Sequence, residues 1–105
     1  MKCAVPHLFG LKNMYYVYVL RSKKDGKLYT GFTENPEKRL KKHNTGEVLS
    51  TKGRGPFEIV YFEGCKNKTD ALHREIYLKT SWGKRYVKNR IKNYMKIQNK
   101  LATVG

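Results

Sequence analysis

Two tyrosines and a glycine near the start of the chain are the first residues whose types and spacing could do chemistry. Tyr18 and Tyr29 flank Asp25-Gly26, a pair that strongly favours a hairpin turn. If the hairpin loop holds an even number of residues, Tyr18, Tyr29 and Gly31 share one face, and Gly31 leaves room there for a large flat group. The alternative is a pair of core tyrosines beside an incidental glycine, because aromatic cross-strand pairs are common.

A second pair lies in the run PEKRLKKHN. Arg39 and His43 are four residues apart, so they share one face of a helix. A guanidinium can hold a phosphate through two parallel hydrogen bonds, and an imidazole can move a proton or hold a phosphate oxygen. Taken alone, such a pair is most often part of a solvated helix face.

Glu75 is one of only eight acidic residues in the chain. Leu72 and Ile76 lie beside it at helical spacing, so we expect Glu75 to border an apolar stripe that reaches the core. A carboxylate in that position, in a chain this basic, needs a cation. The cation is either a lysine or arginine, or it is Mg²⁺, which commonly takes one carboxylate and completes its shell with water and phosphate oxygens.

The charge of the chain indicates a polyanionic partner. There are 23 Lys and Arg against 8 Asp and Glu, for a formal net charge of +15. Phosphates neutralised by Lys or Arg release condensed counterions, which favours binding to nucleic acid. A membrane surface is the alternative, but it calls for an amphipathic helix with an uninterrupted apolar face, whereas the aromatic residues here gather in strand-like runs. We expect Lys42, Lys52 and Arg54 to contact the substrate.

Length and composition favour one small cytoplasmic domain. The 105 residues contain no run of about 18 apolar residues that could span a membrane, and the first residues lack the features of a signal peptide. Cys3 and Cys65 have no partner at metal-ligand spacing, so we expect two unrelated reduced thiols. We expect residues 1–13 to be either a disordered leader or the result of a start assigned before Met14, residues 14–98 to form the domain, and residues 99–105 to be a frayed tail.

The elements that must position these side chains follow from periodicity and turn residues. Asn35 and Asn67 are expected to cap the first two helices, and Gly83 to end the second. Residues 48–55 predict an exposed basic loop. The predicted strands are Tyr15–Leu20, Leu28–Phe32 and Pro56–Glu63, and the predicted helices are Pro36–Asn44, Asn67–Ser81 and Tyr86–Met95. The order ββαβαα predicts an α+β layered domain with a three-stranded sheet flanked by helices.

These motifs together resemble the GIY-YIG endonucleases. Tyr16-Val17-Tyr18, ten further residues and Tyr29-Thr30-Gly31 are similar to the paired motif that names this family. The runs EKRLKKHN and ALHREIYLK are similar to the segments that hold its helix-one arginine and its metal-binding glutamate. The first glycine of the name motif is Tyr16 here. The resemblance covers residues 14–95 and is closest to small standalone members without a second domain.

The resemblance implies a metal-assisted hydrolysis of a phosphodiester bond. By analogy with the family, Tyr29 is the general base, Tyr18 orients the water or the phosphate, and Arg39 stabilises the charge on the phosphate. Glu75 anchors Mg²⁺ or Mn²⁺, and His43 belongs to the same site. The family also uses an asparagine after the glutamate helix, for which Asn89 is preferred here over Asn93.

Three functions remain open at this point. The first is an active endonuclease on DNA, with a partner protein as one source of specificity. The second is a non-catalytic module that binds DNA or RNA on the same scaffold, and the third is a basic ribosome-associated protein. Nothing in the sequence demands a dimer, so we expect a monomer. A nuclease site requires the side chains of Tyr18, Tyr29, Arg39, His43 and Glu75 to converge on one concave patch.

Overall fold

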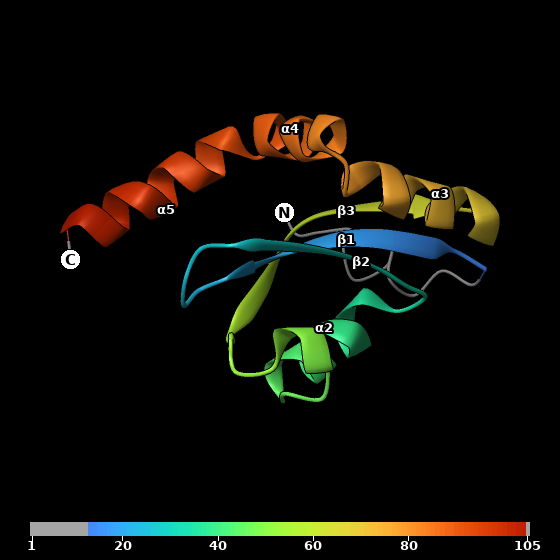
Figure 1. Ribbon diagram of the computed structural model, residues 1–105, viewed down its shortest axis with the longest axis horizontal. Helices are drawn as coiled ribbons and strands as arrows, with labels where there is room; N and C mark the ends of the chain where they lie inside the picture. Colours follow the sequence, from blue (N-terminus) through green and yellow to red (C-terminus); the bar gives the residue numbers. More distant parts are fainter. Residues whose placement is uncertain (1–12, 105) are drawn as a thin grey trace, which may run out of the picture.

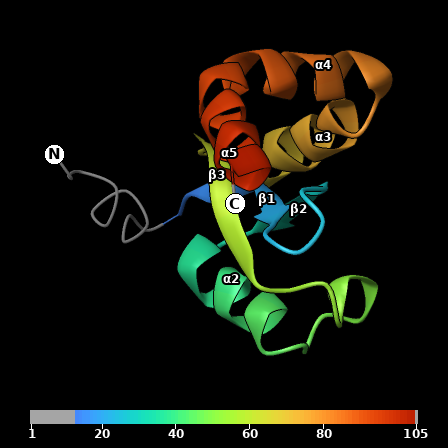
Figure 2. The same ribbon diagram turned by 90° about the vertical axis from the view of Figure 1, so that its left-hand side faces the viewer.

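The computed structural model of the chain describes residues 13–104, and the side chains of residues 13–101. Its elements are β1 (Tyr15–Ser22), β2 (Leu28–Thr33), α2 (Pro36–Asn44), the short 3₁₀ helix η1 (Leu49–Thr51), β3 (Phe57–Cys65), α3 (Lys68–Leu78), α4 (Ser81–Arg90) and α5 (Lys92–Val104). They form an antiparallel sheet with α2 on one face and α3, α4 and α5 on the other (Figures 1 and 2). The predicted α+β layered fold is confirmed.

Strand β1 is the centre of the sheet, whose order is β2-β1-β3. Its residues from Tyr16 to Leu20 are all buried, as a continuous apolar run predicts for a strand covered on both faces. In the β1–β2 hairpin Tyr18 opposes Gly31 and Leu20 opposes Tyr29. Opposed residues share a face, so the predicted register of Tyr18, Tyr29 and Gly31 is confirmed.

The two faces of the sheet carry separate apolar clusters. Val17 and Val19 face the helices α3 to α5 and pack with Leu78 and Val87. Tyr18, Leu20 and Phe57 face the other way, and Tyr29 and Leu40 pack against them. Alternation along β1 therefore sends Tyr18 toward α2, the helix that carries Arg39 and His43.

Both predicted helix starts are confirmed. The Asn35 side chain accepts a hydrogen bond from the Lys38 amide at 3.1 Å, and Pro36 occupies the first turn of α2. The Asn67 side chain accepts one from the Asp70 amide at 3.1 Å at the start of α3. These caps fix where each helix begins, and therefore which side chains turn toward the sheet.

The predicted ends of the later helices are wrong. Helix α3 stops at Leu78, and Gly83 lies inside α4 rather than ending α3. The start of α4 is capped by Thr80, whose hydroxyl accepts a hydrogen bond from the Gly83 amide at 3.1 Å. A Cβ at position 83 would collide with the Tyr77 carbonyl, so this glycine permits the close packing of α4 against the end of α3.

The C-terminal part of the chain is more helical than predicted. The expected third helix is divided at Ile91 into α4 and α5, and α5 continues to Val104. Helix α5 thus includes residues 99–104, for which a frayed tail is expected, and residues 1–12 of the expected leader lie outside the described residues. The loop expected at 48–55 contains η1, which buries Thr51. On α3 the buried residues are Ala71 and Leu78, whereas Ile76 is exposed.

Candidate active site

A cavity of about 650 Å³ lies at the β2 edge of the sheet. Gly31 and the five residues expected to form a catalytic group line it: Tyr18, Tyr29, Arg39, His43 and Glu75. Helices α2 and α3 cover opposite faces of the sheet (Figure 1), and the cavity also includes Thr30 and Phe32 from the α3 side of β2. The cavity therefore passes around the edge strand, which allows Arg39 on α2 and Glu75 on α3 to line the same space.

Gly31 leaves the space through which the Tyr18 side chain reaches this edge of the sheet. Any Cβ at position 31 would collide with the phenol end of the Tyr18 side chain. The Tyr18 ring thus lies across β2 at the one place where β2 has no side chain, and its hydroxyl reaches the cavity. The glycine was predicted to leave room for an approaching group, and part of that room is taken by Tyr18.

A chain of hydrogen bonds joins Tyr18 to α2 and η1. Arg39 Nε lies 3.4 Å from Tyr18 Oη, Tyr18 Oη lies 2.9 Å from His43 Nε2, and His43 Nδ1 lies 2.8 Å from Thr51 Oγ1. Thr51 donates to the Val48 carbonyl at 3.4 Å. With the single Thr51 proton on the Val48 carbonyl, the matching neutral tautomer of His43 donates from Nδ1–H to Thr51 and accepts from the Tyr18 hydroxyl at Nε2.

The electrostatics of the site determine the charge of both rings. Burial raises the pKa of the Tyr18 phenol, and its contact with Arg39 offsets part of that rise. Burial, together with the Arg39 charge, lowers the pKa of His43. Both shifts favour the neutral forms. A neutral Tyr18 whose proton is directed to His43 is suited to orienting a bound water, because its oxygen keeps lone-pair capacity to accept a hydrogen bond.

We predict that Thr51→Val removes the partner that sets the His43 tautomer. Thr51 is 1% exposed, so the unpaired Nδ1–H would cost about 1–3 kcal/mol of folding free energy. Urea denaturation measures this loss, and ¹⁵N NMR of the imidazole reports the tautomer. Thr51→Ser should restore both values. An unchanged His43 tautomer in Thr51→Val would show that Thr51 does not set the direction of donation along these hydrogen bonds.

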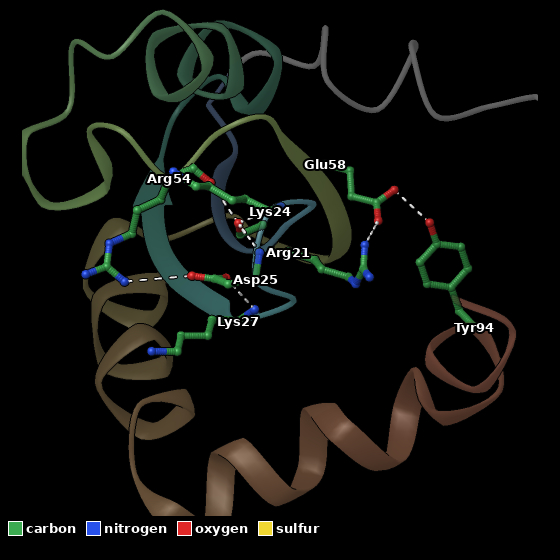
Figure 3. Close-up of polar contacts among 8 residues, drawn as sticks. Arg21, Lys24, Asp25, Lys27, Arg54, Glu58 and Tyr94 are labelled. Atoms are coloured by element: carbon green, nitrogen blue, oxygen red, sulfur yellow. Dashed lines mark hydrogen bonds and ion pairs between the residues drawn. The ribbon is translucent and has the colours of Figure 1, made fainter. Parts of the chain in front are cut away.

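Tyr29 is connected to the loop before β3 through Arg54. Arg54 Nη1 donates to Tyr29 Oη at 3.1 Å. The same nitrogen lies 3.9 Å from Asp25 Oδ2 at the hairpin tip, a pair that Figure 3 shows. The Tyr29 ring packs edge-on against Phe57, with centroids 5.5 Å apart. Arg54 was predicted to contact the substrate directly. In the structure it places a positive charge beside the phenol oxygen of Tyr29.

Glu75 is the one carboxylate among the residues that line this cavity. Its side chain is 19% exposed and lies between the buried Ala71 and Leu78 on α3. Lys79 Nζ is 3.0 Å from Glu75 Oε2. Of the two cations considered for Glu75, a lysine is therefore present, at the C-cap of the helix that carries Glu75.

The residues of the cavity fit a metal held largely by its substrate. Within residues 13–101 there is no group of three or more His, Cys, Asp or Glu that could enclose an ion. Mg²⁺ is commonly bound by one or two carboxylates, with waters and substrate phosphates in the remaining positions. A single half-buried carboxylate such as Glu75 agrees with that arrangement, provided that Lys79 gives way.

Lys79→Gln is predicted to strengthen the binding of Mn²⁺ to the free protein. The Lys79 side chain is 55% exposed, so solvent screening limits its pairing with Glu75 to about 1 kcal/mol or less, which corresponds to an increase in affinity of about fivefold at most. Mn²⁺ titration followed by electron paramagnetic resonance measures the change. Lys68→Gln, an exposed change at the other end of α3, should have no effect. If the wild type, Lys79→Gln and Lys68→Gln bind Mn²⁺ with equal affinity, Lys79 does not compete with the metal for Glu75.

Four of the predicted substrate-binding residues do not line the cavity, and Arg54 is one of them. Lys42 and Lys52 are exposed on α2 and after η1, and Asn89 is exposed on α4. The cavity instead includes Thr51, Lys79 and Lys84, which the sequence analysis did not select. Lys79 had a sequence signal, because it follows Glu75 at i+4. Thr51 and Lys84 had none, because tertiary packing alone brings η1 and α4 to this edge.

Comparisons with known proteins identify the family that this chain resembles in sequence. The family model described as the GIY-YIG catalytic domain matches residues 14–89. A UPF0213 protein of Clostridium perfringens is 54% identical over 67 residues, which are 63% of this chain and 71% of that protein. A UPF0213 protein of Oceanobacillus iheyensis is 44% identical over 70 residues, 66% of this chain and 80% of that protein. The solution structure of a UPF0213 protein from Bacillus halodurans matches with 36% identity and a TM-score of 0.45, covering 70% of this chain and 81% of the other.

Proposed function

The chain belongs to the GIY-YIG family, and from that premise we propose that it is a metal-dependent endonuclease that hydrolyses phosphodiester bonds in DNA. The observation that carries the proposal is the single cavity shared by Tyr18, Tyr29, Arg39 and Glu75, which come from both layers of helices and from the hairpin. Core packing alone does not require these polar groups to meet. A phosphodiester in this cavity would lie between a phenol, a guanidinium and a carboxylate.

Each residue has a distinct role in the proposed reaction. Tyr29, as the phenolate, is the general base that takes a proton from the attacking water and becomes a neutral phenol, and Arg54 places a positive charge beside the oxygen that receives the proton. Tyr18 orients that water, with its own proton held by His43. Arg39 stabilises the negative charge that grows on the phosphate oxygens.

Glu75 would hold the metal, Mg²⁺ or Mn²⁺. When bound, the ion supplies electrostatic stabilisation of the phosphate and leaving oxygens. The protein would contribute the Glu75 carboxylate, while Lys79 would release it and turn toward the phosphate.

Of the described helices, none is long and apolar enough to cross a membrane. We propose that the unit formed by residues 14–98 acts as a cytoplasmic monomer.

A non-catalytic nucleic-acid-binding module is the second candidate. The observation that favours it is the Lys79–Glu75 ion pair at 3.0 Å, which satisfies the carboxylate without a metal. In that case the cavity would bind a phosphate through Arg39, Lys79 and Lys84, and no hydrolysis would follow.

Cleavage assays separate these candidates. The protein is incubated with single-stranded, duplex, flapped and branched DNA, and with RNA of the same sequences, in Mg²⁺ or Mn²⁺. An endonuclease cleaves at least one DNA substrate with a metal and none in EDTA. Binding without cleavage of any substrate would favour the module. Faster cleavage of RNA than of DNA would overturn the proposed substrate.

A further inference from the structure

A second groove, of about 600 Å³, adjoins the candidate active site. Its floor is apolar, formed by side chains of β1, β2 and the helices above them: Val19, Leu28, Leu78, Val87 and Met95. Five lysines surround this floor: Lys27, Lys84, Lys88, Lys92 and Lys96. We call this feature the lysine groove.

Four of these lysines repeat at every fourth residue along α4 and α5. Lys84 to Lys96 covers roughly 18 Å at the rise of an α-helix. Lysines at i and i+4 repel each other, and none of the five has a carboxylate within ion-pair distance among the described residues. The sequence explains this, because residues 76–105 contain eight Lys and Arg and no Asp or Glu. Bound anions would relieve the repulsion.

The position of α5 fixes one wall of the groove. Tyr94 Oη donates to Glu58 Oε1 at 2.7 Å, and Glu58 Oε2 accepts from Arg21 Nη1 at 3.1 Å (Figure 3). This contact joins α5 to β3 and β1, while Ile91 and Met95 pack on the core. The lysines of α5 are thus carried on a helix that the sheet holds in place.

The lysine groove is continuous with the candidate active site. Leu28, Thr30 and Lys84 line both spaces. A strand whose phosphate lay beside Arg39 and Glu75 would pass Lys84 as it left the cavity, and would then meet the other lysines in turn. A site for a single anion would not require a line of lysines this long. A site for a polyanion unrelated to the reaction would not require a connection to the candidate active site.

We propose that the lysine groove binds the nucleic-acid strand on one side of the scissile phosphate. The ammonium groups contact successive phosphates, and Leu28 and Met95, the partly exposed residues of the apolar floor, contact sugar and base surfaces. This inference rests on the proposed function for the identity of the ligand, although it concerns binding rather than hydrolysis. It moves the main substrate contacts away from Lys42 and Lys52, where the sequence had suggested them.

The test compares two triple variants with the same change in charge. The groove variant is Lys88→Gln, Lys92→Gln, Lys96→Gln, and the control is Lys38→Gln, Lys66→Gln, Lys68→Gln. All six lysines are exposed, and the control residues line neither space. Binding of a fluorescent DNA oligonucleotide is followed by anisotropy in EDTA over a series of salt concentrations, so that no cleavage occurs.

The groove variant should bind at least tenfold more weakly at low salt. Its slope of log affinity against log salt should fall by about 2 to 3, since each phosphate contact contributes about 0.7 to 0.9. The control should keep nearly the wild-type slope, and replacing the same three groove lysines with arginine should restore binding. Equal losses in the groove and control variants, or wild-type binding by the groove variant, would overturn the proposal. A protein that binds through the groove but never cleaves would refute the nuclease and leave the groove standing.

Discussion

Replacing Glu75 with glutamine is expected to lower the rate of DNA cleavage by about 10²- to 10³-fold, because a lost metal ligand removes several kcal/mol of charge stabilisation. Affinity for DNA should stay the same or increase. Glu75 is the one carboxylate that lines the cavity, so its removal eases the approach of a phosphate. It also frees Lys79, now 3.0 Å from it, to contact that phosphate.

The measurement is single-turnover cleavage at several metal concentrations, with anisotropy for binding. Asp70→Asn is the matched control, because it removes one negative charge from the exposed first turn of the same helix. It should cleave at nearly the wild-type rate. If Glu75→Gln cuts as fast as wild type at saturating metal, Glu75 does not bind the metal. If both variants lose activity alike, the effect belongs to the charge of α3 as a whole.

The parts of the site that lie within one hairpin or one helix were predictable from sequence. The Asp25-Gly26 turn and the alternation of β1 fixed the register that puts Tyr18, Tyr29 and Gly31 on one face. The Asn35 cap indicated where α2 begins. Within that helix, the four-residue spacing puts Arg39 and His43 on one face. These features depend on interactions between near neighbours in the chain, which sequence patterns describe well.

The parts that depend on contacts between distant segments were not predictable. Gly83 was taken for a helix breaker, although its role is to let α4 approach the Tyr77 carbonyl. The line of lysines on α4 and α5 is visible in the sequence, but the groove appears only when α5 is fixed to the sheet through Tyr94 and Glu58. Thr51 lies in a segment without hydrophobic periodicity, so no sequence pattern selected it. Its hydrogen bond to His43 forms only when the fold buries it beside that residue.

Replacing Arg39 with alanine is expected to lower the cleavage rate by about 10²- to 10³-fold, the usual cost of removing one preorganised group that stabilises developing charge. DNA affinity should fall only a few fold, because one phosphate contact among many is lost. Arg39 also donates to Tyr18 at 3.4 Å, so part of the loss would come from a less well oriented Tyr18.

Arg39→Lys separates the two contributions. Lysine keeps a positive charge but lacks the planar fork that can bind two phosphate oxygens at once. If charge alone matters, Arg39→Lys should recover most of the rate, and if geometry matters it should stay near the alanine variant. Lys38→Ala, which removes one charge from an exposed neighbour on α2, should leave turnover unchanged. A large loss of binding with an unchanged rate in Arg39→Ala would mean that Arg39 holds the substrate equally before and during the reaction, and would remove it from the catalytic group.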